Sequence, residues 1–174
     1  MKRIVLLVLL FFPSIGFAEN VCPSWILAQA GKERYESRLE HASEWISDVE
    51  DTLWAHRLHP KWLYLMLSES GGKLDAVSKH GAVGPWQLTS LIARKYGCRD
   101  RKDPVQATIA AASYIKKLLV DFNGDEAKVI MAYNMGGSNL RKYGPTREAK
   151  NLSALVMCLF KTDPLLLTQK EFDK

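Results

Sequence analysis

The chain has 174 residues, of which 47% are hydrophobic, and its formal net charge is +5 at pH 7. This length suffices for one globular domain with a hydrophobic core and is too short for two ordinary domains. The moderate positive charge suits an acidic polymer as a partner. Lysine and arginine form no cluster with interleaved aromatic residues, so no nucleic acid partner is indicated.

The first 18 residues have the order of a secretory signal peptide. Lys2 and Arg3 precede an apolar run over residues 4–12, and the small residues Gly16 and Ala18 place a cleavage site after Ala18. The alternative, an uncleaved membrane anchor, is disfavoured because the run is shorter than the roughly 20 residues that span a bilayer. Cleavage removes two cations, so the formal charge falls from +5 to +3. We therefore expect an exported protein, in the periplasm, without a stable membrane anchor.

Three cysteines, Cys22, Cys98 and Cys158, allow one disulfide and leave one thiol over. Their spacing does not decide among the three pairings. Cys98 with Cys158 is favoured, because each closes a predicted helical segment whereas Cys22 lies near the N-terminus. The sequence has no CxxC motif and no histidine pair at ligand spacing, so neither a metal nor a cofactor is predicted.

Residues 24–57 contain no proline and one glycine, and their apolar residues alternate spacings of four and three. These apolar positions are Tyr35, Leu39, Ala42, Ile46, Val49 and Leu53. The pattern predicts one long helix with a single apolar stripe. Because the stripe covers fewer than three heptads, packing against the rest of the domain is favoured over a coiled coil with a partner helix.

A second helix is predicted from Pro60, which suits the first position of a helix, to the glycine pair Gly71 and Gly72. Its first part is apolar on all sides, which indicates burial. Residues 73–86 are expected to form a loop or a small hairpin. Further helices are predicted at 87–96, 104–121, 125–135 and 148–161. The pattern as a whole predicts a mainly α fold.

Glu69 ends the buried helix and shares a face with Trp62, Leu65 and Met66, at spacings i, i+3, i+4 and i+7. A dry environment disfavours the carboxylate, and the negative end of the helix dipole acts in the same direction. Both effects favour an acid that holds its proton near neutral pH, as a glutamic acid in an apolar pocket does in lysozyme. The alternative is a helix-end glutamate that faces water and has no chemical role.

Three segments follow one another along the chain: "ESGGKLDAVSKHGAVGPWQL", "DPVQATIAAASYIKKLLVDFNGD" and "IMAYNMGGSN". In this order they resemble the lysozyme-like catalytic domain of the soluble lytic transglycosylases, which cleave the glycan strands of peptidoglycan. The resemblance runs from about Pro60 to Gly144. It implies a mainly α, lysozyme-like single domain that covers residues 59–163 and includes a small loop or hairpin region. This domain follows the predicted signal peptide at 1–18 and an N-terminal helical segment at 19–58. Residues 164–174 are then a C-terminal tail.

The resemblance implies that Glu69 is the single catalytic acid and base. It further implies that five residues bind the sugar chain: Ser78, Gln87, Tyr114, Tyr133 and Asn134. The amides among them offer donors and acceptors, as sugar hydroxyls and N-acetyl groups require. Each also has a purely structural alternative, a turn or cap for the amides and core packing for the tyrosines.

The chain departs from the family pattern at Gly72, where the family often has an aromatic residue, so one wall of the cleft is expected to be built differently. Trp86 has two open interpretations, stacking on a sugar or packing in the core. Gly81 and Gly84 are interpreted as positions that supply backbone freedom and a close approach to a ligand rather than chemistry.

Ordinary glycosidases use two carboxylates, yet the acid nearest to Glu69 in sequence, Asp75, lies in a predicted loop and is not assigned as nucleophile. A single acid fits the mechanism that the resemblance implies. The glutamic acid protonates the bond between N-acetylmuramic acid and N-acetylglucosamine, and the resulting base takes the proton of the sugar's C6 hydroxyl to close a 1,6-anhydro ring. Two alternatives stay open: a hydrolase of the goose-lysozyme kind, and a peptidoglycan-binding or assembly protein. A partnership with a secretion or conjugation apparatus also stays open.

Overall fold

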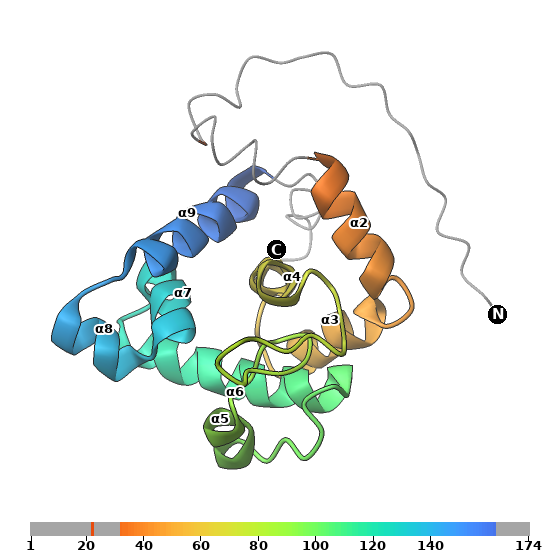
Figure 1. The fold of residues 1–174 in the computed structure, drawn as a ribbon, viewed down its shortest axis with the longest axis horizontal. Helices are drawn as coiled ribbons and strands as arrows, with labels where there is room; N and C mark the ends of the chain where they lie inside the picture. The colour runs from red at the N-terminus through yellow and green to blue at the C-terminus, as the bar shows by residue number, and fades with distance from the viewer. Residues whose placement is uncertain (1–21, 23–31, 163–174) are drawn as a thin grey trace.

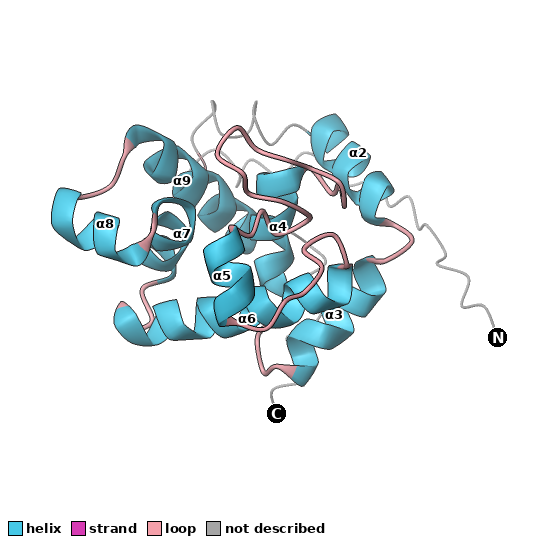
Figure 2. Ribbon diagram, turned by 60° about the horizontal axis from the view of Figure 1, so that its bottom comes forward, coloured by secondary structure: helices cyan, strands magenta, loops and turns pink. Residues whose placement is uncertain are grey.

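The computed structural model describes residue 22 and residues 32–162, and the predicted signal peptide and C-terminal tail lie outside these ranges. The described part is mainly helical, as predicted, and contains no β-strand (Figures 1 and 2). Its helices are α2 (Lys32–Ala42), α3 (Ile46–Ala55), η1 (Pro60–Trp62), α4 (Leu63–Ser70), α5 (Ser90–Lys95), α6 (Pro104–Asp121), α7 (Glu126–Met135), α8 (Gly137–Tyr143) and α9 (Arg147–Thr162). No helix within the described ranges is long and apolar enough to cross a membrane.

Side chains that accept hydrogen bonds from backbone amides set the starts of three helices. Thr89, Asp103 and Asp125 cap α5, α6 and α7, each by accepting from the amide three residues further on. Pro104 at the first position of α6 has the fixed φ that a helix start requires. These local signals explain why the predicted starts near 104 and 125 agree with the structure.

The predicted single helix over 24–57 is wrong in one respect, because the described part of it is two helices. The chain turns between Ala42 and Ile46, where the Ser43 hydroxyl donates to the Glu40 carbonyl and Trp45 is buried at the corner. The apolar stripe is therefore divided. Val49 and Leu53 of α3 are buried where α3 packs against α6, whereas α2 contacts the glycine turn that follows α4. Packing against the domain, which the sequence favoured, is confirmed for α3.

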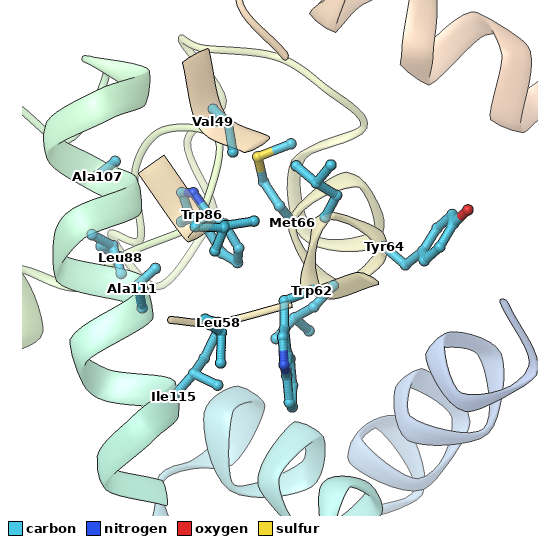
Figure 3. Packing of buried hydrophobic residues seen from close by; sticks show 14 of the residues in the cluster. Val49, Leu58, Trp62, Tyr64, Met66, Trp86, Leu88, Ala107, Ala111 and Ile115 are labelled. Atoms are coloured by element: carbon cyan, nitrogen blue, oxygen red, sulfur yellow. The ribbon is translucent and has the colours of Figure 1, made fainter. Parts of the chain in front are cut away.

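The core surrounds α4, and five consecutive residues of this helix, Leu63–Leu67, are buried. Figure 3 shows Trp62 and Met66 among the buried side chains, and Trp86 and Leu88 opposite Ala107 and Ala111 of α6. The alanines let the indole approach the helix, and its N–H donates to the Thr108 hydroxyl at 2.8 Å. Core packing is thus the correct interpretation of Trp86, which is fully buried.

The loop between α4 and α5 forms the small hairpin-like structure that was expected (Figure 2). Val83 forms isolated antiparallel bridges with Val77 and with Leu88. Gly84 has φ +84°, and a Cβ added there would lie 1.7 Å from the carbonyl oxygen of Arg101. The backbone freedom predicted for Gly84 is confirmed, whereas the predicted close approach to a ligand stays a prediction. The close approach to the Arg101 backbone holds the loop against the segment that leads into α6.

Helix α8 was not predicted, because the sequence "MGGSN" has a glycine pair. The structure uses the pair as a corner: Gly136 takes φ +87° between α7 and α8, and Gly137 begins the new helix. A Cβ on Gly137 would meet Leu118 and Phe122 at 3.4 to 3.5 Å. The small residue therefore lets α8 pack closely on the end of α6.

The disulfide joins Cys22 to Cys158, so the predicted pairing of Cys98 with Cys158 is wrong. Cys98 is a buried free thiol whose sulfur donates to the Asp100 carbonyl. It follows α5, which packs on α6, whereas Cys158 lies on α9, which packs on α4 and α7. Both cysteines do end helical segments, but the fold sends those segments to different neighbours.

Candidate active site

Glu69 lies in the last turn of α4, and Gly71 ends the helix with φ +66°. The residues before Glu69 on its face are buried, as the spacing predicted. The carboxyl group itself is partly buried and lines a cavity of about 680 Å³. Glu69 is therefore not a fully exposed helix-end residue, and its chemical role stays a prediction.

Burial raises the pKa of Glu69 to about 7, and the negative charge of Glu148 acts in the same direction. A hydrogen bond from the Asn134 side chain lowers the pKa of Glu69 and offsets part of this rise. Near neutral pH the carboxyl group is therefore present both with and without its proton. A group in this state can serve as a general acid and afterwards as a general base.

Four helices contribute residues to the cavity that Glu69 lines: α2, α4, α7 and α9. This cavity is called the larger cavity below. Figure 1 shows α4 nearly end-on between α2 and α9. The lining residues are Arg38, Ser68, Glu69, Asn134, Arg147, Glu148, Asn151, Leu152 and Leu155. Two cations and two acids thus surround a space large enough for a sugar-sized ligand.

A smaller cavity of about 270 Å³ adjoins the larger one, because Asn134 lines both. Gln87, Tyr114 and Tyr133 line it as well. Asn134 is the penultimate residue of α7, just before the Gly136 corner, so it stands where the two cavities meet. Five of the six predicted site residues, all except Ser78, line these two adjoining cavities.

The two tyrosines are held as uncharged phenols. Burial, with Tyr96 and Asp121 nearby, raises the pKa of Tyr114 to about 12. Burial and the nearby Glu69 and Tyr114 raise the pKa of Tyr133 well above its usual range. The Tyr133 hydroxyl donates to the Trp86 carbonyl at 2.8 Å, which leaves its oxygen to accept a proton donor. Tyr133 thus lies close enough to Glu69 for the two groups to interact electrostatically.

The amide of Gln87 has a defined orientation. Its nitrogen donates to the carbonyls of Ala76 and Gly84, at 3.1 and 2.8 Å. Two carbonyl acceptors can only be served by the NH₂ group, so the amide oxygen points away from them. The backbone of Gln87 has φ +48°, which is uncommon for a non-glycine residue. This residue therefore combines a structural role in the loop with a position in the smaller cavity.

Ser78 lies apart from the other predicted site residues. Its hydroxyl oxygen accepts from the backbone amides of His80 and Ala82, at 3.2 and 3.0 Å, and so shapes the loop. It lines neither of the two cavities in the described part of the chain. Its role in substrate binding stays a prediction.

Sequence reasoning missed Arg38, Arg147 and Glu148 as site residues. Glu148 lies 79 positions after Glu69, on an exposed helix start that carries no motif of its own. Arg38 lies on the N-terminal helix, where no pattern pointed to a site. No group of three or more metal-ligating side chains occurs among residues 22 and 32–162.

The sequence of the chain matches a known protein family. Residues 52–156 match the family described as Transglycosylase SLT domain. The chain belongs to this family. It is 32% identical over 95 residues to membrane-bound lytic murein transglycosylase D of Escherichia coli K12, a match that covers 51% of this chain and 21% of the relative. It is 39% identical over 72 residues to peptidoglycan transglycosylase gp16 of Escherichia phage T7, covering 37% of this chain and 6% of the relative.

Among solved structures, lytic transglycosylase Slt of Pseudomonas aeruginosa, in an inactive mutant form, has a similar fold. The TM-score is 0.56 at 22% identity, and the match covers 64% of this chain and 22% of that chain. The mainly α, lysozyme-like architecture that the sequence predicted is thus confirmed. The chain spans about a fifth or less of the length of these relatives.

Proposed function

We propose that the protein is an exported lytic transglycosylase that acts on the glycan strands of peptidoglycan in the periplasm. It would cleave the β-1,4 bond between N-acetylmuramic acid and N-acetylglucosamine and leave a 1,6-anhydro-muramyl end. The observation that carries the proposal is Glu69, a partly buried acid with a pKa of about 7 that lines a cavity of about 680 Å³ in a family member.

In the first step, protonated Glu69 donates its proton to the glycosidic oxygen, and the bond to the anomeric carbon breaks. Asn134 donates a hydrogen bond to the carboxylate that results and so stabilises it. In the second step, the carboxylate accepts the proton of the C6 hydroxyl while that oxygen bonds to the anomeric carbon. Glu69 ends protonated and no water is consumed.

The tyrosines and Gln87 would bind the sugar next to the cleaved bond. Tyr114 and Tyr133 contact each other with ring centroids 5.5 Å apart and form an aromatic surface beside the smaller cavity. Gln87 adds an amide oxygen that accepts from a sugar hydroxyl or N-acetyl N–H. Because all three are held by hydrogen bonds to backbone carbonyls, the subsite is organised before substrate arrives.

Hydrolysis is a second candidate, and Glu148 is the specific observation that favours it. This exposed carboxylate lines the same cavity as Glu69, where a second carboxylate could activate a water molecule. The two reactions differ in the product. Transglycosylation leaves an anhydro end that is lighter by one water than the reducing end left by hydrolysis.

The test is digestion of purified sacculi, followed by mass spectrometry of the released fragments. We expect anhydro-muropeptides from the wild type and at least about a hundredfold less product from Glu69→Gln. Asp75→Asn is the matched control, because Asp75 is exposed, lies close in sequence and lines neither cavity; it should retain wild-type activity. Reducing-end products alone would favour hydrolysis, and equal activity of Glu69→Gln would favour a binding protein.

Export can be tested separately by sequencing the N-terminus of the protein recovered from periplasm. We expect the mature chain to begin at Glu19. A partnership with a secretion or conjugation apparatus stays a prediction of the sequence.

A further inference from the structure

Helix α2 lies before the family match, which begins at residue 52, yet it contributes to the larger cavity. It is attached to the domain by Ala42, which is fully buried, and by Leu39, which packs against the core. His41 adds a polar contact, with Nδ1 3.3 Å from the Gly71 carbonyl oxygen. The helix is therefore held against the turn that directly follows Glu69.

The contact between α2 and this turn is close enough to exclude a side chain. A Cβ added to Gly72 would lie 2.2 Å from the carbonyl oxygen of Arg38. Gly72 is the position where the sequence departs from the family's frequent aromatic residue. The backbone of α2 thus occupies the space beside Gly72, and the different cleft wall that the sequence predicted is supplied by α2.

Arg38 places a guanidinium group at this wall. A Cβ on Gly71 would lie 3.9 Å from Arg38 Cγ, so the side-chain stem runs past the end of α4. The side chain lines the cavity that holds Glu69. The ion pairs found within the described ranges involve neither Arg38 nor Arg147. Both cations of the cavity therefore remain available to an anionic ligand.

We propose that Arg38 binds a carboxylate carried by the muramyl residue of the substrate, and so selects strands that contain muramic acid. The inference rests on the proposed function. Muramic acid differs from glucosamine by a lactyl ether, whose carboxylate is free or carries a peptide that has carboxylates of its own. A guanidinium group recognises a carboxylate through two parallel N–H donors, which a lysine cannot reproduce.

The test measures binding by the full mature chain in the Glu69→Gln background, where turnover does not obscure affinity. Three ligands separate the sources of the carboxylate: peptide-bearing glycan strands, amidase-treated strands with free lactyl groups, and chitohexaose, which has no carboxylate. We expect Arg38→Gln to weaken binding of at least one muramic acid ligand by about tenfold and to leave chitohexaose unchanged. The ligand that loses affinity identifies the carboxylate.

Two further variants exclude simpler explanations. Arg99→Gln removes the same charge from an exposed loop that lines neither cavity, so it should bind all three ligands like the parent. Arg38→Lys retains the charge without the paired donors and should recover only part of the affinity, at an unchanged melting temperature. An equal loss on all three ligands, or no loss on any, would overturn the role of Arg38. Failure of the parent to bind any ligand would instead overturn the proposed function.

Discussion

Helices α2 and α9 line the same cavity from opposite sides of α4, but with different chemistry (Figure 1). Most of α9 lies within the family match, and its Glu148 helps to raise the pKa of Glu69. Helix α2 lies before the match and contributes one cation, Arg38, which is not among the causes of that shift. Helix α9 therefore affects the pKa of Glu69, the proposed acid, whereas α2 adds a cation to the cavity that is not among the causes of the pKa shift.

The disulfide joins the segment before α2 to α9, because Cys22 precedes α2 in the chain and Cys158 lies on α9. It closes a loop with a sequence separation of 136 residues. We expect Cys22→Ser to lower the free energy of unfolding by about 4 kcal/mol, because a long loop loses much entropy when it is closed in the unfolded chain. Urea denaturation without reductant measures the change.

Cys98→Ser is the control for this prediction. Serine can retain the hydrogen bond to the Asp100 carbonyl, so the expected loss is about 1 kcal/mol or less. Equal losses for the two variants would show that Cys22 is not bonded as the structure has it. Under denaturing conditions the wild type should expose a single reactive thiol.

The attachment of α2 can be broken at Gly72. The Cβ of an alanine at Gly72 would clash with the Arg38 carbonyl oxygen, whereas the Cβ of an alanine at Gly81 would meet no other atom. The two positions have similar φ angles, +76° at Gly72 and +78° at Gly81. Both variants strain the backbone by about 1 kcal/mol, and we expect Gly72→Ala to cost about 2 kcal/mol more because the helix must shift. The difference between the two melting curves isolates the contact with α2. Identical curves would mean that α2 is not packed on this turn.

The influence of α9 on the acid can be tested through pH. In the proposed mechanism the acid form of Glu69 starts the reaction, so activity should fall as pH rises through about 7. Glu148→Gln removes a negative charge that raises this pKa, so the fall should move to lower pH. The movement should be a fraction of a pH unit, because Glu148 is exposed and solvent screens its charge.

The control is Glu44→Gln, which removes one exposed negative charge from outside the cavity and should leave the profile unchanged. Movement of the profile to higher pH in Glu148→Gln would contradict the assigned electrostatic role. Arg38→Gln tests the contribution of α2 in the same way. It should alter substrate binding without moving the pH profile of the activity.

Local patterns predicted the features that depend on residues close in sequence. The burial of α4, its end at Gly71 and the starts of α6 and α7 follow from spacing, glycine and caps, and the structure confirms them. The position of Glu69 beside large apolar residues follows from helical periodicity alone. The backbone freedom predicted for Gly84 was also correct, because its φ of +84° is a conformation that favours glycine.

The failures share a cause, which is that each depended on a distant segment. The break at residues 43–45 occurs because α2 and α3 pack against different neighbours, a choice that the continuous apolar stripe does not reveal. Cys98 was favoured over Cys22 because helix ends were the only local guide. Ser78 is a different case, because its hydroxyl accepts from two amides of its own loop and its role in substrate binding stays a prediction.

By itself the sequence determined the mainly α class and the family resemblance, and it singled out Glu69 as the candidate acid, because periodicity, caps and ordered motifs are written along the chain. Only the tertiary structure decided what surrounds that acid. Arg38, Asn134 and Glu148 come from three helices separated by long stretches of sequence, and they meet only when α2, α7 and α9 pack around α4. Electrostatic interactions depend on distance in space, so the pKa of Glu69 is a property of that packing.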